Sequence, residues 1–208
     1  MPAVHATDTA AAAHLLSAVT AARRAVSQLR VPDKTEITGF TALLAPFGLT
    51  GTVVTADALH TQREHAKWLA EAKNAHYLMV VKGNQPKLHA AVRALPWKKV
   101  TARRYDRERG HGHRKTRSVR TLTVTGLGLD SPHIVQAVKI LRHRTDLKTG
   151  KATRQTLHAI TDMTSAEASP QLIGRIARTQ WSIEAVHHVR DTTFAEDASK
   201  IRTGHGPE

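Results

Sequence analysis

Two short apolar runs, GTVVTAD (51–57) and HYLMVVKG (76–83), decide the fold class of this chain. Both are rich in β-branched or apolar residues and are short enough to be buried strands. The segment between them, TQREHAKWLAEAK (61–73), places its apolar residues at helical spacing. Strand, helix and strand in close succession form a βαβ unit, so we predict that the two strands are parallel neighbours.

The residues before this unit allow two interpretations. The alanine content of HLLSAV (14–19) and AVSQLRV (25–31) favours a helix, whereas the alternation in the second run also suits a strand. Propensity alone leaves this open. Residues 35–46 are predicted to form a short helix that ends near Pro46.

The middle of the chain has a different pattern. After a helix predicted over 86–94, the run RRYDRERGHGHRKTR (103–117) is too polar for a core and suits contacts with phosphate. Three later runs alternate with a period of two and are separated by turns that contain Gly or Asp. They are RSVRTLTV (117–124), AVKILRHRTD (137–146) and RQTLHAITDM (154–163). This pattern predicts a small antiparallel β region.

Helical patterns return at the end of the chain. One helix is predicted over 165–179 and another over 182–197, each beginning at a serine that could cap it.

The composition narrows the functional class. Lys and Arg number 31 against 17 Asp and Glu, which gives a formal charge of +14 over 208 residues. The excess is spread over several segments, which favours a nucleic-acid partner over a merely soluble basic protein. The absence of cysteine excludes disulfides and thiolate zinc sites. No apolar run approaches the ~20 residues that span a bilayer. We therefore expect no membrane association and a cytoplasmic location.

Two acids are candidates for a catalytic site. Asp57 follows a predicted parallel strand, where open α/β sheets place their sites, but it could equally cap the next helix. Glu184 shares one helical face with His187, His188 and Asp191. By local pattern alone, a solvated charged face is the favoured explanation of this second group.

Polar side chains follow both predicted strands. They are His60, Gln62, Lys82, Asn84 and Gln85. Because parallel strands end at the same edge of a sheet, we expect these residues to lie near Asp57 and to contact phosphates, although each alone could be an ordinary surface residue. His111 and His113 could suggest a metal site, but without Cys or a second pair this interpretation is disfavoured.

Several long motifs, in order, resemble one family. They are VVTADALHTQ (53–62), YLMVVKGNQP (77–86), RERGHGHRKTR (107–117) and WSIEAVHHVRDTTFAEDASKIRTG (181–204), with HLLSAV and QLRVPDKTEITGF (28–40) upstream. Together they resemble the H-repeat-associated, or ISAs-type, branch of insertion-sequence DDE transposases over roughly residues 14–208.

The resemblance implies a fold and a domain order. The expected class is α/β, with an RNase H-like core of a mixed sheet flanked by helices. Residues 14–97 would form the first part of this core, 98–163 a β-rich insertion and 164–208 its C-terminal helical part, after a disordered lead-in over 1–13. The runs 14–19 and 25–31 then become strands.

The resemblance also implies a catalytic chemistry. Family members hold two divalent ions, Mg²⁺ or Mn²⁺, on three acids, and cleave and join DNA strands at insertion-sequence ends. By position, Asp57 matches the second acid and Glu184 the third. The implied partner is double-stranded DNA, bound by a homodimer or by a heteromer with full-length transposase at the bacterial nucleoid. The implied DNA contacts are Lys34, His60, Gln62, Lys82, Asn84, Gln85, Arg109, His111, Arg114, Arg117, His187, His188 and Arg190.

The chain departs from the family pattern in its first acid. The family carries this acid in a D-G-K segment shortly before HLLSAV, where this chain reads MPAVHATDTAAAA. Lys34-Thr35-Glu36 is one residue short of the family's K-T-N-E-I, and Ala185 replaces the usual Asn. These departures, with an earlier C-terminal end, predict a truncated element with impaired catalysis. The alternative is a non-catalytic DNA-binding remnant that competes with or regulates full-length transposase.

Overall fold

The computed structural model describes residues 14–22, 24–31, 36–110 and 112–180. The chain divides into two compact units, one of Met1–Ala45 with Trp181–Glu208 and one of Pro46–Gln180. The expected disordered lead-in over 1–13 and the helix expected over 182–197 lie outside the described residues. No described helix is long and apolar enough to cross a membrane.

The described part of the first unit is a hairpin with a helix. Strands β1 (His14–Val19) and β2 (Ala25–Val31) pair in antiparallel fashion. Helix α1 (Glu36–Leu44) packs closely on them, because a Cβ added to Gly39 would lie 2.7 Å from Val31 Cγ1. The strand interpretation of both runs, which the resemblance implies, is therefore confirmed, and the alternation in AVSQLRV agrees with it.

The second unit contains the predicted βαβ motif. Strands β3 (Val53–Ala56) and β4 (His76–Val81) are parallel neighbours, and helix α2 (Arg63–Glu71) connects them. Residues 77–81 of β4 are buried on both faces, which explains why that run is apolar throughout. This prediction is confirmed. Helix α3 (Pro86–Ala94) also lies where the sequence predicts it.

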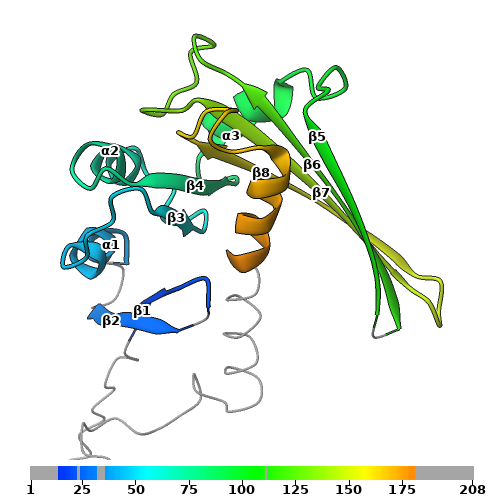
Figure 1. Cartoon of the computed structure of the whole chain (residues 1–208), viewed down its shortest axis with the longest axis horizontal. Helices are drawn as coiled ribbons and strands as arrows, with labels where there is room; N and C mark the ends of the chain where they lie inside the picture. Colours follow the sequence, from blue (N-terminus) through cyan, green and yellow to red (C-terminus); the bar gives the residue numbers. More distant parts are fainter. Residues whose placement is uncertain (1–13, 23, 32–35, 111, 181–208) are drawn as a thin grey trace, which may run out of the picture. The chain divides into compact units, whose positions relative to one another are not determined.

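One mixed sheet runs through the second unit (Figure 1). Its strand order is β3-β4-β8-β7-β6-β5, and β8 (Ala152–Thr161) joins the others by pairing antiparallel to β4. The remaining strands are β5 (Arg103–Gly110), β6 (His113–Thr123) and β7 (Gln136–Asp146). The α/β class, a mixed sheet flanked by helices, is confirmed. The β-rich segment continues the sheet of the βαβ motif, and the domain boundaries stay a prediction.

Strand β5 was not predicted, because its sequence is polar throughout. Its side chains are mostly exposed, and it forms the edge of the sheet beside β6. Strand β6 also begins at His113, earlier than the predicted 117. The polar run 103–117 is thus mainly a β-hairpin.

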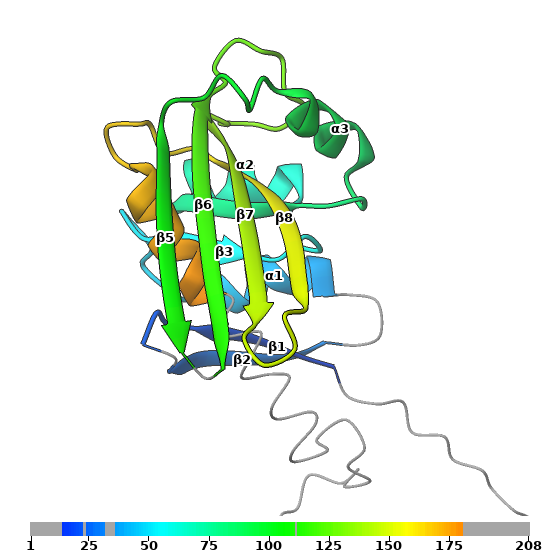
Figure 2. The same ribbon diagram turned by 90° about the vertical axis from the view of Figure 1, so that its right-hand side faces the viewer.

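A helix over residues 170–180 covers one face of β5 and β6, where Figure 2 shows it behind these strands. A Cβ added to Gly174 would lie 3.1 Å from Val119 Cγ2, so helix and sheet pack closely. The cap is Ser169, whose Oγ accepts from Leu172 N at 3.3 Å. The prediction that this helix begins at Ser165 was wrong, because residues 165–167 form a separate turn.

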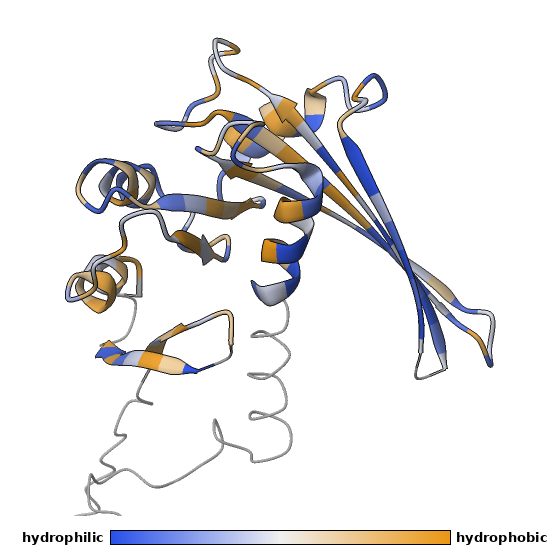
Figure 3. Cartoon of the chain, in the orientation of Figure 1, coloured by the Kyte–Doolittle hydropathy of each residue, from blue (hydrophilic) through white to orange (hydrophobic). Residues whose placement is uncertain are grey.

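The core of this unit lies where β4, β8 and β7 meet. Tyr77, Met79, Ile140 and Ile160 are at most 1% exposed, and Ile173 of the helix over 170–180 is fully buried. Figure 3 shows apolar residues gathered in this part of the strands and hydrophilic ones toward the far end of the β5–β6 hairpin. The sheet therefore has a buried half and a solvated half.

Candidate functional site

Asp57 lies directly after β3, at the carboxyl end of the parallel pair, and its side chain is exposed. Its Oδ1 accepts hydrogen bonds from Leu59 N at 3.1 Å and His60 N at 3.4 Å. The N-cap of α2 is Gln62, without a side-chain cap bond. The alternative interpretation of Asp57 as the cap of the next helix was therefore wrong: its carboxylate stabilises the turn after β3.

The turn after β3 is tied to β4 and to the loop that follows it. Thr61 Oγ1 donates to the main-chain oxygen of Val80, and Asn84 Nδ2 donates to that of Ala58. Gln85 Nε2 donates to Gln62 Oε1 at 3.3 Å. The segments 57–62 and 82–85 thus form one hydrogen-bonded edge of the sheet, and they are two of the motifs on which the family resemblance rests.

The structure brings the five polar residues expected at this edge to it. Lys82 and Asn84 are exposed, while Gln62 and Gln85 are partly buried and bonded to each other. His60 differs, because it is only 8% exposed and its ring lies 5.9 Å from that of His65. Lys82 is the lysine among these five residues, and it is exposed. Thr61, which has no distinguishing signal in the sequence, connects the turn after β3 to β4 through its hydroxyl.

The carboxylate of Asp57 suits one position of a divalent-metal site. Its Oδ2 takes part in none of the hydrogen bonds or ion pairs of the described residues, and carboxylate oxygen is a ligand that Mg²⁺ and Mn²⁺ accept. Among residues 14–180 as described, no three His, Asp or Glu side chains lie close enough to hold an ion. Glu184, His187, His188 and Arg190 lie outside the described residues, as do Lys34 and His111.

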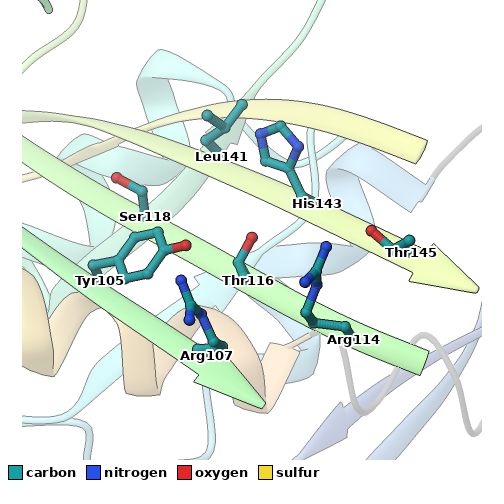
Figure 4. A pocket seen from close by; sticks show the side chains of 8 residues that line it. All are labelled: Tyr105, Arg107, Arg114, Thr116, Ser118, Leu141, His143 and Thr145. Carbon is teal, nitrogen blue, oxygen red and sulfur yellow. The ribbon is translucent and has the colours of Figure 1, made fainter. Parts of the chain in front are cut away.

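The basic residues of the β5–β6 hairpin divide between its two faces. Arg109 and Arg114 are cross-strand partners and share a face. Arg117 lies on the other face, where its Nη1 is 2.9 Å from Glu108 Oε2 and its side chain is only 12% exposed. Arg117 is thus neutralised within the protein, whereas Arg114 lines a shallow hollow together with Tyr105 and Arg107 (Figure 4).

Thr61→Val is expected to lower the free energy of unfolding by about 1–2 kcal/mol, because the buried carbonyl of Val80 loses its donor. Thr123→Val, at the exposed end of β6, is the matched control and should change it by under about 0.5 kcal/mol. Urea denaturation of both variants measures the difference. Equal stabilities would show that this hydrogen bond does not hold the edge.

Comparison with known proteins adds family information. The family model described as Transposase DDE domain matches residues 15–207. The chain is 29% identical over 211 residues to "Putative transposase YncI" of Escherichia coli O157:H7, covering 95% of this chain and 53% of that protein. It is 26% identical over 208 residues to "H repeat-associated putative transposase YhhI" of Escherichia coli K12, covering 95% and 55%.

A solved structure is also similar at low identity. The cryo-EM structure of the piggyBac transposase synaptic complex with hairpin DNA matches 80% of this chain and 31% of its own, with a TM-score of 0.40 and 9% identity. The chain spans about half the length of the curated relatives it matches. The match over residues 15–207 includes all strands of the mixed sheet, and the RNase H-like character of the core stays a prediction. The chain belongs to the Transposase DDE domain family.

Proposed function

We propose that this chain is the part of a DDE transposase that carries the second and third metal-binding acids, Asp57 and Glu184. The proposed reaction is cleavage and transfer of DNA strands at insertion-sequence ends. The observation that supports it best is the edge after β3 and β4, where an exposed carboxylate lies in a hydrogen-bonded rim formed by two family motifs. Open α/β sheets place their sites at this edge.

Asp57 and Glu184 would be the protein's ligands to two Mg²⁺ or Mn²⁺ ions. Such ions, when bound, supply a Lewis acid for the phosphodiester oxygens and an activated nucleophile. Asp57 would contribute Oδ2, because Oδ1 is held by the turn. Lys82, exposed at the same edge, would attract a DNA phosphate, and Gln62 with Gln85 would keep the two loops in register.

We expect a polypeptide of these 208 residues to nick element-end DNA weakly or not at all. The sequence holds matches to the second and third acids but none to the D-G-K segment. Two carboxylates supply fewer ligands than the family's three, and without an ion between them they repel each other. The measurement is Mg²⁺- or Mn²⁺-dependent nicking of labelled DNA, with Glu184→Ala as control. Robust nicking that Glu184→Ala abolishes would contradict this expectation while supporting the site.

A second candidate function is a non-catalytic DNA-binding protein that competes with, or assembles with, a full-length transposase at the nucleoid. The formal charge of +14 favours it, because electrostatic affinity for DNA does not need the catalytic acids. It predicts salt-dependent binding that Asp57→Asn leaves unchanged. Binding that is absent or indifferent to salt would exclude this function.

A further inference from the structure

One face of the strands β5–β8 carries many cations and no acid. Successive residues of a strand point to opposite faces, so the pairing registers define which side chains share a face. On one side lie Arg107, Arg109, Arg114, Arg120, Lys139 and Arg154. Among the described residues of β5–β8, no Asp or Glu lies on this side. We call it the cationic face.

The opposite face holds the acids of these strands, and they are paired. Asp106 Oδ1 lies 2.9 Å from Arg104 Nε, and its Oδ2 lies 3.5 Å from Arg178 Nη1 of the helix over 170–180. Glu108 pairs with Arg117 at 2.9 Å, and Asp146 Oδ2 lies 3.8 Å from His113 Nδ1. The sheet therefore segregates its acids. All three lie on the opposite face beside cations, although that face also carries Lys115, Arg142 and Arg144, whereas the cationic face has cations without acidic neighbours on the strands.

The open end of the cationic face is hollowed and lined with groups that bind phosphate. A concavity of about 370 Å³ lies over β5, β6 and β7 (Figure 4). Arg107 and Arg114 border it, with the hydroxyls of Thr116, Ser118 and Thr145 between and beside them. Tyr105 is 56% exposed, and the Arg107 guanidinium lies 5.9 Å from its ring. Guanidinium and hydroxyl groups are common donors to DNA phosphates.

Positive charges on this face act on the ionisable groups beside them. Hydrogen bonds from the Arg107 and Thr116 side chains, together with the charge of Arg114, hold the pKa of Tyr105 below its usual value. Burial lowers the pKa of Lys139, and the charges of Arg120 and Arg154 lower it further. Cations that lie this close repel one another, and a bound polyanion would remove that repulsion.

We propose that the cationic face of β5–β8 binds the phosphodiester backbone of double-stranded DNA, at a site separate from the edge that carries Asp57. This rests on the proposed function, which supplies DNA as the polyanion. A duplex fits better than a single strand, because sheets that bind single strands stack bases on several aromatic side chains. At its hollow this face presents two rings, Tyr105 and His143, among five guanidinium and hydroxyl groups, so phosphate donors outnumber stacking surfaces there.

The test compares two double variants with the same loss of charge. Arg107→Gln with Arg114→Gln alters the cationic face, and Arg104→Gln with Arg144→Gln alters the opposite face. Binding of a labelled 30-base-pair duplex to the full chain is measured by fluorescence anisotropy in EDTA over a range of salt. Circular dichroism melts establish that both variants fold.

At low salt, the cationic-face variant should bind DNA at least about tenfold more weakly than the wild type. Its plot of log K against log salt should become less steep, with the magnitude of the slope reduced by about 2. The opposite-face variant should keep the wild-type slope. If both variants lost DNA affinity equally, the loss would reflect the net charge of the protein and not the cationic face, and the proposal would be overturned. An unchanged slope in the first variant, no binding by the wild type, or preference for single-stranded DNA or RNA would also overturn it.

This experiment separates the proposal from the proposed function. Binding is measured in EDTA, so it does not depend on cleavage or on the acids that would hold metal. A chain that binds through the cationic face but never nicks, even when a D-G-K segment is supplied upstream, would refute the catalytic function alone. A chain that nicks but binds equally well without Arg107 and Arg114 would refute the cationic face alone.

Discussion

Replacing Asp162 by alanine is expected to lower the free energy of unfolding by about 3 kcal/mol. Asp162 follows β8, and its carboxylate accepts from Tyr77 N and His76 Nδ1, each at 2.8 Å, at the start of β4. Its side chain is only 11% exposed. The variant would leave the Tyr77 N–H without an acceptor and remove a charged hydrogen bond, each worth about 1–3 kcal/mol. Urea denaturation measures the loss.

Two comparisons make this prediction specific. Asp162→Asn keeps an oxygen for Tyr77 N but loses the charge, so its effect should be intermediate. Asp130→Ala removes a carboxylate that pairs with Arg63 at the surface, where the side chains are 69% and 56% exposed, and should cost under about 1 kcal/mol. If Asp162→Ala were no more harmful than Asp130→Ala, the carboxylate would not anchor β4.

The βαβ unit and its polar edge could be predicted because their signals are local. The apolar run of β4 reflects burial on both faces, and a short crossover helix forces the two strands to be parallel. The edge then follows from geometry, since both loops must leave the sheet on the same side. The bonds that tie Thr61 and Asn84 to main-chain oxygens could not be predicted, because they depend on the exact conformation of two loops.

Strand β5 was not predicted because its period of two lies in charge and not in hydropathy. The acids Asp106 and Glu108 occupy one face, while Tyr105 and Arg107 occupy the other. An analysis of apolar alternation finds nothing in such a run. The same segregation that hides the strand creates the cationic face, so charge alternation in a polar run is the signal that would have found both.

The start of the helix over 170–180 shows a signal that was available in the sequence. Ser169 followed by Pro170 is a typical helix start, because a proline in the first turn needs no hydrogen bond from its nitrogen. Ser165 is also a possible cap by residue type, but no proline follows it.

The third acid, Glu184, is assigned by its sequence motif. Its distance from Asp57 stays a prediction, because Glu184 lies outside the described residues.

Acid is expected to destabilise the protein through His158. This residue of β8 is 7% exposed, and its ring lies 6.0 Å from that of Trp97 and 5.8 Å from that of His89. Burial lowers its pKa to about 4, and the charges of Lys139, His89 and Arg93 act in the same direction. The folded protein therefore holds this ring neutral at a pH where the unfolded chain would protonate it.

The sign of the effect follows from this lowered pKa. Above about pH 6.5, His158 is neutral in both the folded and the unfolded state and does not change the stability. From pH 6.5 down to about 4, the unfolded chain alone takes up the proton, so the free energy of unfolding falls as the pH falls. His158 should thus account for a loss of about 3 kcal/mol across this window. His158→Phe and His158→Gln both remove the titrating ring, so denaturation from pH 7 to pH 4 should show a flatter decline in each than in the wild type. If the free energy of unfolding declined as steeply in both variants as in the wild type, groups other than His158 would cause the acid sensitivity.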